Sequence, residues 1–252
     1  MSEHDFSNNT RRILISIVAA TFPILAIGTL PKLSLGQTVN VVAPLKIGII
    51  GSGNIGSTVG TLWVKAGHQV LFSSRHPEEL KSLVDGLGPL ARAGSVRDAL
   101  TFGDVVFIGV PYGAYPQIGK DYAKEFVGKI VLDAGNAVLA RDGEIAKPAR
   151  ENGVALTSAK LLAGARIVRA FNILNFRKVA GNANRPDGRI AMPIASDDQE
   201  ALKVASSLVR DAGFDPVVVG SLQRSKLFEQ GGPLYGAEIS AQEMRERLKT
   251  LQ

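Results

Sequence analysis

Three glycines with a characteristic spacing are the clearest indication of a binding site in this chain. They stand in the stretch Gly51-Ser52-Gly53-Asn54-Ile55-Gly56. Backbone without bulky side chains can approach a diphosphate closely, and the free N–H groups and dipole at a helix N-terminus attract its negative charge. We expect Gly51 to allow a tight turn, Gly53 to admit the phosphates, and Gly56 to let the helix pack against the preceding strand. The pattern predicts a turn that binds the pyrophosphate of a dinucleotide.

The glycine turn lies between the elements that such a site requires. An apolar run that contains Ile47, Ile49 and Ile50 precedes it, and apolar residues at helical spacing follow it as far as Gly67. A second apolar run, Val70–Phe72, comes next. The order of strand, glycine turn, helix and strand is that of a βαβ unit that binds a dinucleotide. A glycine-rich turn in an ordinary α/β protein is the alternative.

The residues that follow the second apolar run favour NADP(H) over NAD(H). NAD-binding folds usually place an acidic residue there, which binds the ribose 2′-hydroxyl group. This chain has Ser73, Ser74, Arg75 and His76 at that point, and its next acidic residue is Glu78. A guanidinium forks onto a 2′-phosphate and hydroxyl groups donate to it, whereas a carboxylate would repel it. We therefore expect the two serines and the arginine to bind the 2′-phosphate, with a solvated surface arginine as the alternative.

Composition excludes several classes of function. The 252 residues are 45% apolar and 21% charged, which is ordinary for a globular protein. The formal net charge of +6 is spread along the chain rather than gathered in a basic block, so we expect no nucleic-acid partner. The chain has no cysteine, which rules out disulfides, thiolate metal ligands and a cysteine nucleophile. We predict no metal site.

We expect residues 1–36 to be a targeting segment rather than part of the fold. Arg11 and Arg12 precede the apolar run Ile13–Leu30, an order that is typical of a secretory signal peptide. The arginine pair also resembles the twin-arginine export motif, which would place the protein in the periplasm or otherwise outside the cytoplasm. One alternative is an uncleaved anchor, since about 20 apolar residues span a bilayer. The other is a misassigned start codon and a cytoplasmic protein; only this segment is expected to meet a membrane.

After a short linker at 37–44, residues 45–252 alternate apolar strands with helical patterns. This alternation predicts an α/β fold with a doubly wound parallel sheet, of Rossmann type, with a short C-terminal extension. The strands expected beyond the glycine unit are 91–94, 104–110, 129–132, 167–171, 189–194 and 216–219. The expected helices are 77–87, 96–100, 117–126, 160–163, 197–212 and 242–248.

Two further loops are expected to lie at the site. Ligands of such sheets bind beyond the carboxyl ends of the strands, close to the point where the strand order reverses. Val110 and Pro111 follow one expected strand, and Ala134 and Asn136 follow the next. These four residues should border the nicotinamide half of the cofactor.

The sequence identifies no catalytic acid or base. None of the three histidines follows a later strand, and none of the four tyrosines has a lysine four positions on. Reduction of a carbonyl usually needs a proton donor with a pKa near neutral. Hydride transfer to a flat redox ring needs stacking and exclusion of water instead, because the cofactors carry the chemistry. The sequence therefore favours transfer between NADP(H) and a flavin or deazaflavin.

Five blocks of the chain resemble, in order, blocks of the F420-dependent NADP oxidoreductase family: KIGIIGSGNIG, FSSRHPEEL, VVFIGVPYGAY, VLDAGNA and IVRAFNIL. A similar domain forms the NADPH-binding part of STEAP metalloreductases. The resemblance covers about residues 45–220. It implies that the glycine turn holds the pyrophosphate and that Ser74 and Arg75 hold the 2′-phosphate. The family often has a further lysine in the phosphate turn, whereas the nearest lysine here is Lys81, so we expect a weaker grip on the 2′-phosphate.

The same resemblance implies that the loops after the later strands line the nicotinamide and its acceptor. On this chain those positions are Val110, Pro111, Ala134, Asn136 and Asn172. F420 or a flavin would then be the co-substrate, a small-molecule redox acceptor the partner, and a homodimer one option for the assembly. An NADP-dependent reductase of a small imine or carbonyl and a non-catalytic dinucleotide sensor are the alternative functions.

Several side chains have a structural interpretation beside a functional one. Asn136 and Asn172 either cap turns at strand ends or contribute to the site. Trp63 is expected to pack in the core, and Tyr112 to cover the edge of the sheet. Glu229 is expected at the surface, with reach into the site as the alternative.

A reporter fused behind residues 1–40 tests the export hypothesis. We expect the reporter to leave the cytoplasm while Arg11 and Arg12 are intact, and to stay inside when both are replaced by lysine. The measurement is the distribution of reporter activity between periplasmic and cytoplasmic fractions. Export of the lysine variant at full rate would contradict the twin-arginine interpretation.

Overall fold

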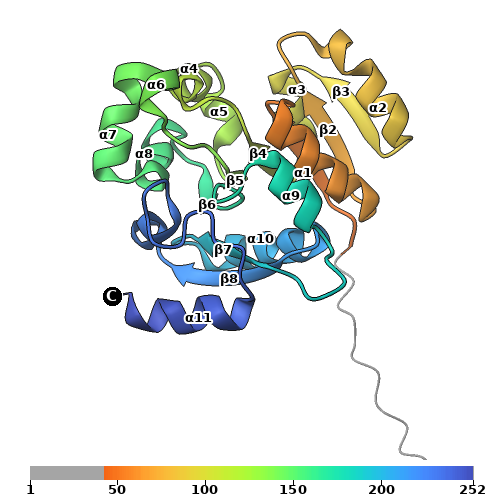
Figure 1. Cartoon of the computed structure of the whole chain (residues 1–252). Coiled ribbons are helices and arrows are strands. Elements are labelled where there is room, and N and C mark those ends of the chain that lie inside the picture. Colours follow the sequence, from red (N-terminus) through yellow and green to blue (C-terminus); the bar gives the residue numbers. More distant parts are fainter. Residues whose placement is uncertain (1–42, 252) are drawn as a thin grey trace, which may run out of the picture. The chain divides into compact units, whose positions relative to one another are not determined.

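An eight-stranded sheet forms the centre of the structure, a computed structural model that describes residues 43–251 (Figure 1). The signal or anchor predicted for residues 1–36 lies outside the described residues. In spatial order the strands are β3 (Ala91–Gly94), β2 (Gln69–Ser73), β1 (Lys46–Ile50), β4 (Val105–Ile108), β5 (Ile130–Asp133), β6 (Arg166–Arg169), β7 (Ala191–Ala195) and β8 (Asp215–Gly220).

The first six strands are parallel, and the chain order reverses between β1 and β4. Ile47 of β1 lies opposite Val70 of β2 on one side and opposite Val105 of β4 on the other. The carboxyl ends of these strands therefore meet at one edge of the sheet. This arrangement confirms the predicted doubly wound, Rossmann-type fold and places the reversal beside the glycine turn.

Strand β7 runs opposite to β6, so the sheet is mostly rather than fully parallel. The two strands meet in antiparallel register at Arg169 and Ala195. The connection contains α9 (Phe176–Asn182), which packs against α1 (Asn54–Lys65) instead of crossing a sheet face (Figure 1). The chain consequently enters β7 from the edge at which β6 ended. Strand β8 then pairs with β7 in parallel after α10 (Gln199–Asp211).

Helices cover the two faces of the sheet and bury two apolar clusters. Side chains of α1, α9 and α10 share one cluster with Ile47 and Ile49 of β1. The other cluster contains Ile50 and side chains of α3 (Val96–Phe102), α4 (Tyr115–Asp121), α7 (Ala146–Asn152) and α8 (Val154–Leu161). Because both faces are covered, β4 and β5 consist entirely of buried residues.

Trp63 of α1 anchors the first cluster, as the sequence predicts. Its ring meets those of Phe107 and Phe171 edge to face, with centroids 5.5 and 5.8 Å apart. Its Nε1–H group donates a buried hydrogen bond of 2.8 Å to the carbonyl of Leu208 in α10. A single side chain thus ties α1 to the sheet and to a helix far away in the sequence.

The remaining helices are short, and this accounts for most differences from the expected elements. They are α2 (Lys81–Leu87), α5 (Ala123–Phe126), α6 (Leu139–Asp142) and α11 (Ala241–Thr250), with 3₁₀ turns at Pro77–Leu80, Tyr112–Ala114, Gly143–Ile145 and Leu222–Phe228. The single helix predicted at 117–126 is interrupted at Tyr122. The segment 139–161 holds three helices broken at Gly143 and Gly153, too short for a clear apolar period. Among residues 43–251, no helix has the length and apolar character needed to cross a membrane.

Replacement of Trp63 by phenylalanine tests its anchoring role. We expect Trp63→Phe to lower the free energy of unfolding by about 1–3 kcal/mol, because the buried hydrogen bond from Nε1 to the carbonyl of Leu208 is lost together with part of the ring packing. Chemical denaturation measures the change, with Lys65→Gln at the exposed end of the same helix as the control. Equal stability of Trp63→Phe and the control would contradict it.

Candidate functional site

The glycine turn has the geometry that a diphosphate site needs. Gly51 has φ +90°, and a Cβ atom at Gly56 would collide with the backbone carbonyl of Gly51. A Cβ atom at Gly53 would meet no atom within 4 Å, so the space over Gly53 is open. The three glycines therefore have the separate tasks predicted for them: a left-handed turn, an open approach, and close packing of α1 on β1.

The N-terminus of α1 faces this open space without a competing anion. Its N-cap residue, Gly53, makes no side-chain cap hydrogen bond, and its first turn contains no acidic residue. Asn54 is exposed and Ile55 is half-buried. The hydroxyl group of Ser52 is buried and has no hydrogen-bond partner in the described chain. Free N–H groups, a positive helix end and an unpartnered hydroxyl fit a pyrophosphate.

The end of β2 separates the three predicted 2′-phosphate ligands into two kinds. Ser73 is fully buried and its hydroxyl donates to the carbonyl of Ile49 at 2.7 Å, so this side chain serves the sheet and cannot face the cofactor. Ser74 is half-buried, and its hydroxyl accepts a hydrogen bond from the N–H of His76. Arg75 is exposed and forms no ion pair with any residue from 43 to 251. Ser74 and Arg75 are the side chains that remain available.

The loop after β4 lies beside the glycine turn, and the loop after β5 follows at the same edge of the sheet. A Cβ atom at Gly51 would contact the side chain of Val110, which places the end of β4 against the turn. Pro111 is exposed, Ala134 is buried, and Asn136 is half-buried. The structure thus brings the candidate pyrophosphate and nicotinamide residues to one edge of the sheet.

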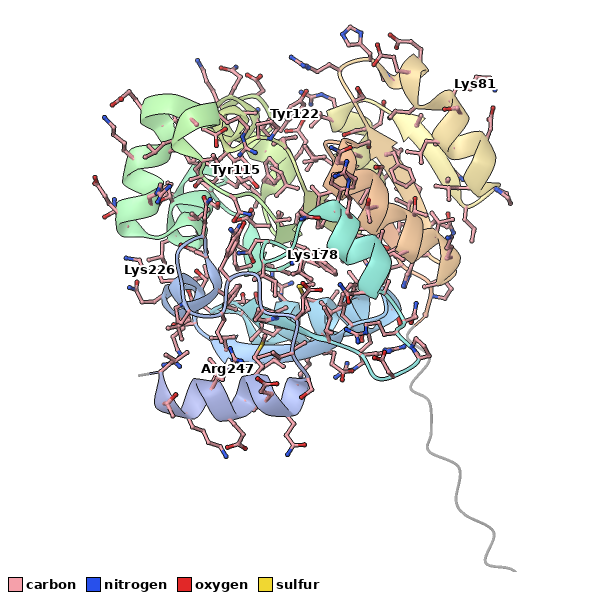
Figure 2. The ribbon with its side chains drawn as sticks, viewed as in Figure 1. Lys81, Tyr115, Tyr122, Lys178, Lys226 and Arg247 are labelled. Atoms are coloured by element: carbon pink, nitrogen blue, oxygen red, sulfur yellow. The ribbon has the colours of Figure 1, made fainter. Side chains whose placement is uncertain are left out.

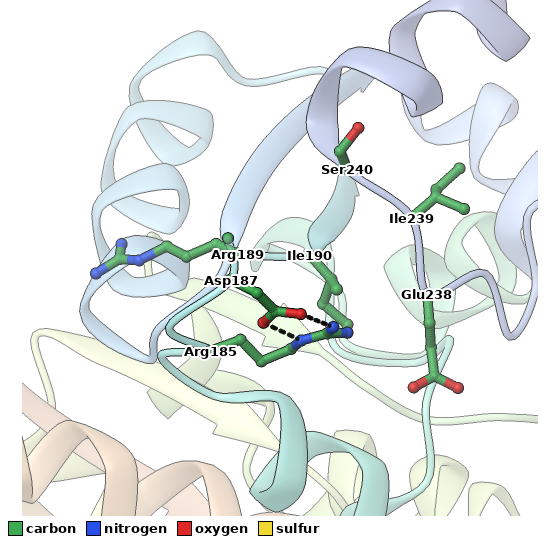
Figure 3. Close-up of a pocket in the computed structure, with 8 residues that line it drawn as sticks. Arg185, Asp187, Arg189, Ile190, Glu238, Ile239 and Ser240 are labelled. Carbon is green, nitrogen blue, oxygen red and sulfur yellow. Dashed lines mark hydrogen bonds and ion pairs between the residues drawn. The ribbon is translucent and has the colours of Figure 1, made fainter.

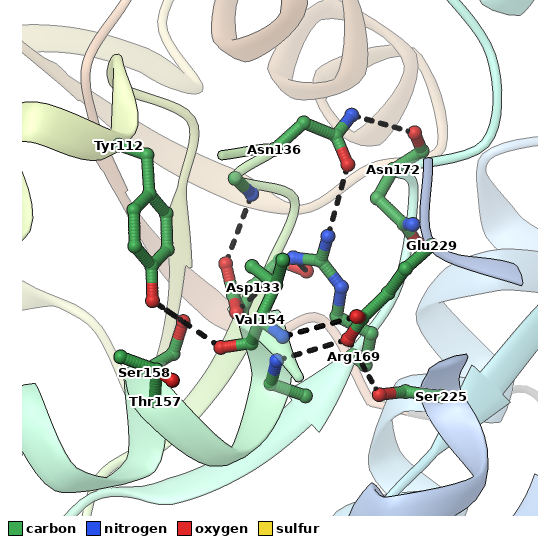
Figure 4. A network of polar contacts seen from close by, with 12 residues as sticks. Tyr112, Asp133, Asn136, Val154, Thr157, Ser158, Arg169, Asn172, Ser225 and Glu229 are labelled. Atoms are coloured by element: carbon green, nitrogen blue, oxygen red, sulfur yellow. Dashed lines mark hydrogen bonds and ion pairs between the residues drawn. The ribbon is translucent and has the colours of Figure 1, made fainter. Parts of the chain in front are cut away.

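A buried polar network supports the loop after β5 (Figure 4). Asp133 and Arg169 are both fully buried, with Oδ2 and Nη1 3.1 Å apart. Arg169 Nη2 donates to Asn136 Oδ1 at 3.0 Å, and Asn136 Nδ2 donates to the carbonyl of Asn172 at 2.8 Å. Asn172 in turn donates to the carbonyl of Phe228. Both asparagines therefore orient the loops of the site, a role beyond that of a simple turn cap.

The network includes two stacked tyrosines that are unsuited to proton transfer near neutral pH. Tyr112 and Tyr115 are fully buried, with ring centroids 4.6 Å apart. Burial raises the pKa of both hydroxyl groups above the ordinary value, and the carboxylate of Asp133 raises that of Tyr115 further. The Tyr115 hydroxyl donates to Asp133 Oδ1 at 2.7 Å, and Tyr112 lies within 3.3 Å of Ser158. Tyr112 belongs to the core rather than to the edge of the sheet.

Glu229 is buried, so its predicted place at the surface is wrong. Its carboxylate accepts hydrogen bonds of 3.0 Å from the N–H groups of Val154 and Ala155, at the start of α8, and one from Ser225. A negative charge is stabilised at a helix N-terminus, which accounts for the burial. The two partners in α8 lie about 75 positions away in the sequence, so no local pattern reveals this contact.

His68 and the surface hollow lie outside this cluster. His68 is buried, where its Nδ1 accepts from the N–H of Leu45 and its Nε2 lies 3.1 Å from Asp211. Within residues 43–251, no group of three His, Cys, Asp or Glu side chains is placed to hold a metal ion. The hollow in Figure 3 is lined by the 185–190 segment and by residues 238–240, with Arg185 paired to Asp187. It contains none of the predicted site residues.

The fold and the turn define a Rossmann-type protein with a dinucleotide-binding fingerprint, and the comparisons narrow the class. Residues 46–137 match the family model described as NADP oxidoreductase coenzyme F420-dependent. This match, over part of the chain, confirms the resemblance to that family noted from the sequence.

Two curated relatives extend the similarity. Metalloreductase STEAP3 of Rattus norvegicus is 29% identical over 184 residues, which are 73% of this chain and 36% of the relative. F420-dependent NADP reductase of Methanocaldococcus jannaschii is 28% identical over 144 residues, 55% of this chain and 63% of the relative. The chain is homologous to both proteins, although it spans only 36% of the longer one.

A solved structure confirms the fold. The hypothetical protein SMa0349 of Sinorhizobium meliloti superposes with a TM-score of 0.68 at 29% identity. The match covers 78% of this chain and 95% of that protein. The similarity therefore extends past the family domain into the second half of the sheet.

Separate alanine substitutions of Ser73 and Ser74 test the division of roles at the end of β2. We expect Ser73→Ala to destabilise the fold by about 1–3 kcal/mol, because a buried hydrogen bond is lost, while NADPH affinity is retained. We expect Ser74→Ala to keep the stability and to weaken NADPH by about 0.5–1.5 kcal/mol. Thermal denaturation and calorimetric titration measure the two quantities. Loss of NADPH affinity in a stable Ser73→Ala protein would contradict the assignment.

Proposed function

We propose that the chain binds NADP(H) and transfers hydride between this cofactor and a flavin-like or F420-like acceptor. One observation carries the proposal, namely that the open turn at Gly53 lies at the same sheet edge as an end of β2 that offers Ser74 and Arg75 but no carboxylate. The family model over residues 46–137 supports NADP as the cofactor. F420 is supported as the co-substrate by the same family description.

The available groups fit the parts of NADP(H). The first-turn N–H groups of α1 and the hydroxyl of Ser52 would bind the pyrophosphate. Arg75 would fork onto the 2′-phosphate while Ser74 donates to it. Val110 and Asn136, on the two neighbouring loops, would border the nicotinamide. When bound, the cofactor supplies the hydride.

The class of acceptor is inferred from the titratable side chains of the polar network, none of which is free to donate a proton to a substrate. The titratable side chains of the polar network are buried and engaged: Asp133 with Arg169, Glu229 with α8, and Tyr115 with Asp133. Reduction of a carbonyl or imine relies on a proton donor beside the substrate. A flavin or deazaflavin relies on stacking and exclusion of water, and solvent supplies its proton. In the balanced reaction, NADPH and one proton convert the oxidised acceptor to its two-electron-reduced form and leave NADP⁺.

Cofactor selectivity tests the NADP assignment. We expect NADPH to bind at least about tenfold more tightly than NADH, and Arg75→Ala to weaken NADPH selectively by about 1.5–3 kcal/mol, the scale of a charged hydrogen bond. Titration of nicotinamide fluorescence measures both affinities. Arg75→Lys is the matched control, which keeps the charge but loses the bidentate geometry of the guanidinium. Its NADPH affinity should fall between those of the parent and Arg75→Ala. Equal affinity for NADPH and NADH in the parent protein would refute the assignment.

The acceptor is tested by following NADPH oxidation with F420, FMN, FAD, a ferric chelate and small carbonyls or imines in turn. We expect F420 or a flavin to consume NADPH, because these rings need no protein proton donor. Turnover with a carbonyl or imine alone would contradict the proposed acceptor and support the alternative reductase. Tight NADPH binding without turnover on any acceptor would support a dinucleotide sensor.

A further inference from the structure

The carboxylate of Asp142 joins two loops of the candidate site. Its side chain is only 1% exposed, although α6, which ends at Asp142, lies near the surface. Its Oδ1 accepts a hydrogen bond of 3.1 Å from the N–H of Gly113, and its Oδ2 accepts one of 2.8 Å from the N–H of Val138. Gly113 follows β4 and Val138 follows β5, so one carboxylate holds the backbone of both loops.

Arg141 completes this contact. Its Nε and Nη2 donate to the two oxygens of Asp142 at 2.9 and 2.8 Å, and Nη2 also donates to the carbonyl of Asn136 at 2.6 Å. Burial alone would raise the pKa of Asp142, but Arg141 and the two backbone amides outweigh it and hold this pKa below its usual value. The carboxylate is therefore charged at neutral pH, which strengthens each bond that it accepts.

Asp142 connects the two loops beyond the last backbone hydrogen bond between β4 and β5; we call this side-chain contact the Asp142 bridge. The β4 and β5 ladder ends where the N–H of Ala134 donates to the carbonyl of Ile108. Past that point, within the described chain, no backbone hydrogen bond joins residues 109–114 to residues 135–142. Side chains make the connection instead. The Tyr115 hydroxyl and the N–H of Gly135 both donate to Asp133 Oδ1, and Asp142, paired with Arg141, accepts from the backbone of each loop.

We propose that Asp142, with Arg141, is a positioning residue that fixes the spacing of the β4 and β5 loops, and thereby holds the nicotinamide ring of NADP(H) in line with its acceptor. The inference rests on the proposed function, because that function places the nicotinamide between these loops. Hydride transfer is sensitive to such a change, since a misplacement of about 1 Å can cost about a hundredfold in rate. The pyrophosphate and 2′-phosphate residues lie on other segments and should not depend on Asp142.

Two ligands separate positioning of the nicotinamide from general damage to the site. NADPH reports on both halves of the site, whereas 2′,5′-ADP reports on the adenosine half alone. The variants are Asp142→Asn, which nearly conserves the shape, and Arg141→Ala, at a side chain that is 46% exposed and so tolerant of change. The matched control is Glu144→Gln, two positions on, at a side chain that is 84% exposed and forms an ion pair with Lys147.

In Asp142→Asn we expect NADPH affinity and the turnover rate to fall by about tenfold or more, with 2′,5′-ADP affinity within about twofold of the parent. Arg141→Ala should show the same pattern to a smaller extent, and Glu144→Gln should match the parent. Unchanged NADPH affinity and rate in both variants would overturn the proposal. So would an equal loss of both ligands, because it would mean general damage to the site.

Hydrogen exchange gives a readout that does not depend on any ligand. In Asp142→Asn, or in Arg141→Ala if the first variant fails to fold, the amides of residues 110–116 and 136–140 should exchange faster, while those of 51–56 keep the parent rate. Unchanged exchange in both loops would overturn the bridge even if NADPH binds. If the parent protein itself binds neither NADPH nor 2′,5′-ADP, while the variant still exchanges faster in both loops, the proposed function is overturned and the role of Asp142 in joining the loops stands.

Discussion

The contact between Gly56 and the carbonyl of Gly51 is the constraint on which the rest of the site depends. No side chain fits at Gly56, because even a Cβ atom would overlap that backbone. The contact draws the start of α1 against the end of β1, so the first N–H groups of the helix point into the space over Gly53. An ordinary N-cap side chain would satisfy these groups from within the protein, and here they stay available to an anion.

A buried ion pair holds the side of the site that the loop after β5 forms. A fully buried ion pair gains little net stability, because desolvation of the two charges offsets most of their attraction. The Asp133–Arg169 pair is better explained as a device that fixes loop geometry, since the guanidinium orients Asn136 and the carboxylate orients Tyr115. Phe171 supports this view: it adopts φ +58°, a conformation that bulky residues rarely take. Under the proposed function, an open turn for the phosphates and a hydrogen-bonded network beneath the β5 loop suit a reaction that depends on the placement of two rings.

The sequence predicts those parts of the site that are local in the chain. The glycine spacing, the flanking apolar runs and the absence of an acid after β2 all fall within residues 45–76, and the structure arranges them as a βαβ unit. Ser73 shows the limit of this approach. Every residue of β2 but the first is buried on a sheet covered on both faces, so strand alternation cannot tell a side chain that faces the ligand from one that bonds a neighbouring strand.

Long-range contacts account for what the sequence could not predict. Glu229 reaches α8 across about 75 positions, and Arg169 reaches Asn136 across 33, and neither leaves a periodic pattern. The reversed strand β7 depends on where α9 packs, which is a property of the tertiary structure. The bridge made by Asp142 combines both difficulties, because α6 is too short to show a period and its partner Gly113 lies 29 positions away.

A crystal structure of the complex with NADP⁺ would decide whether the glycine turn binds the cofactor as proposed. We expect the pyrophosphate to lie against the N–H groups at the start of α1, over Gly53, with the 2′-phosphate in hydrogen-bond contact with Ser74 and Arg75. An empty glycine turn, or adenosine ribose hydroxyls bound by a carboxylate such as that of Glu78, would contradict it.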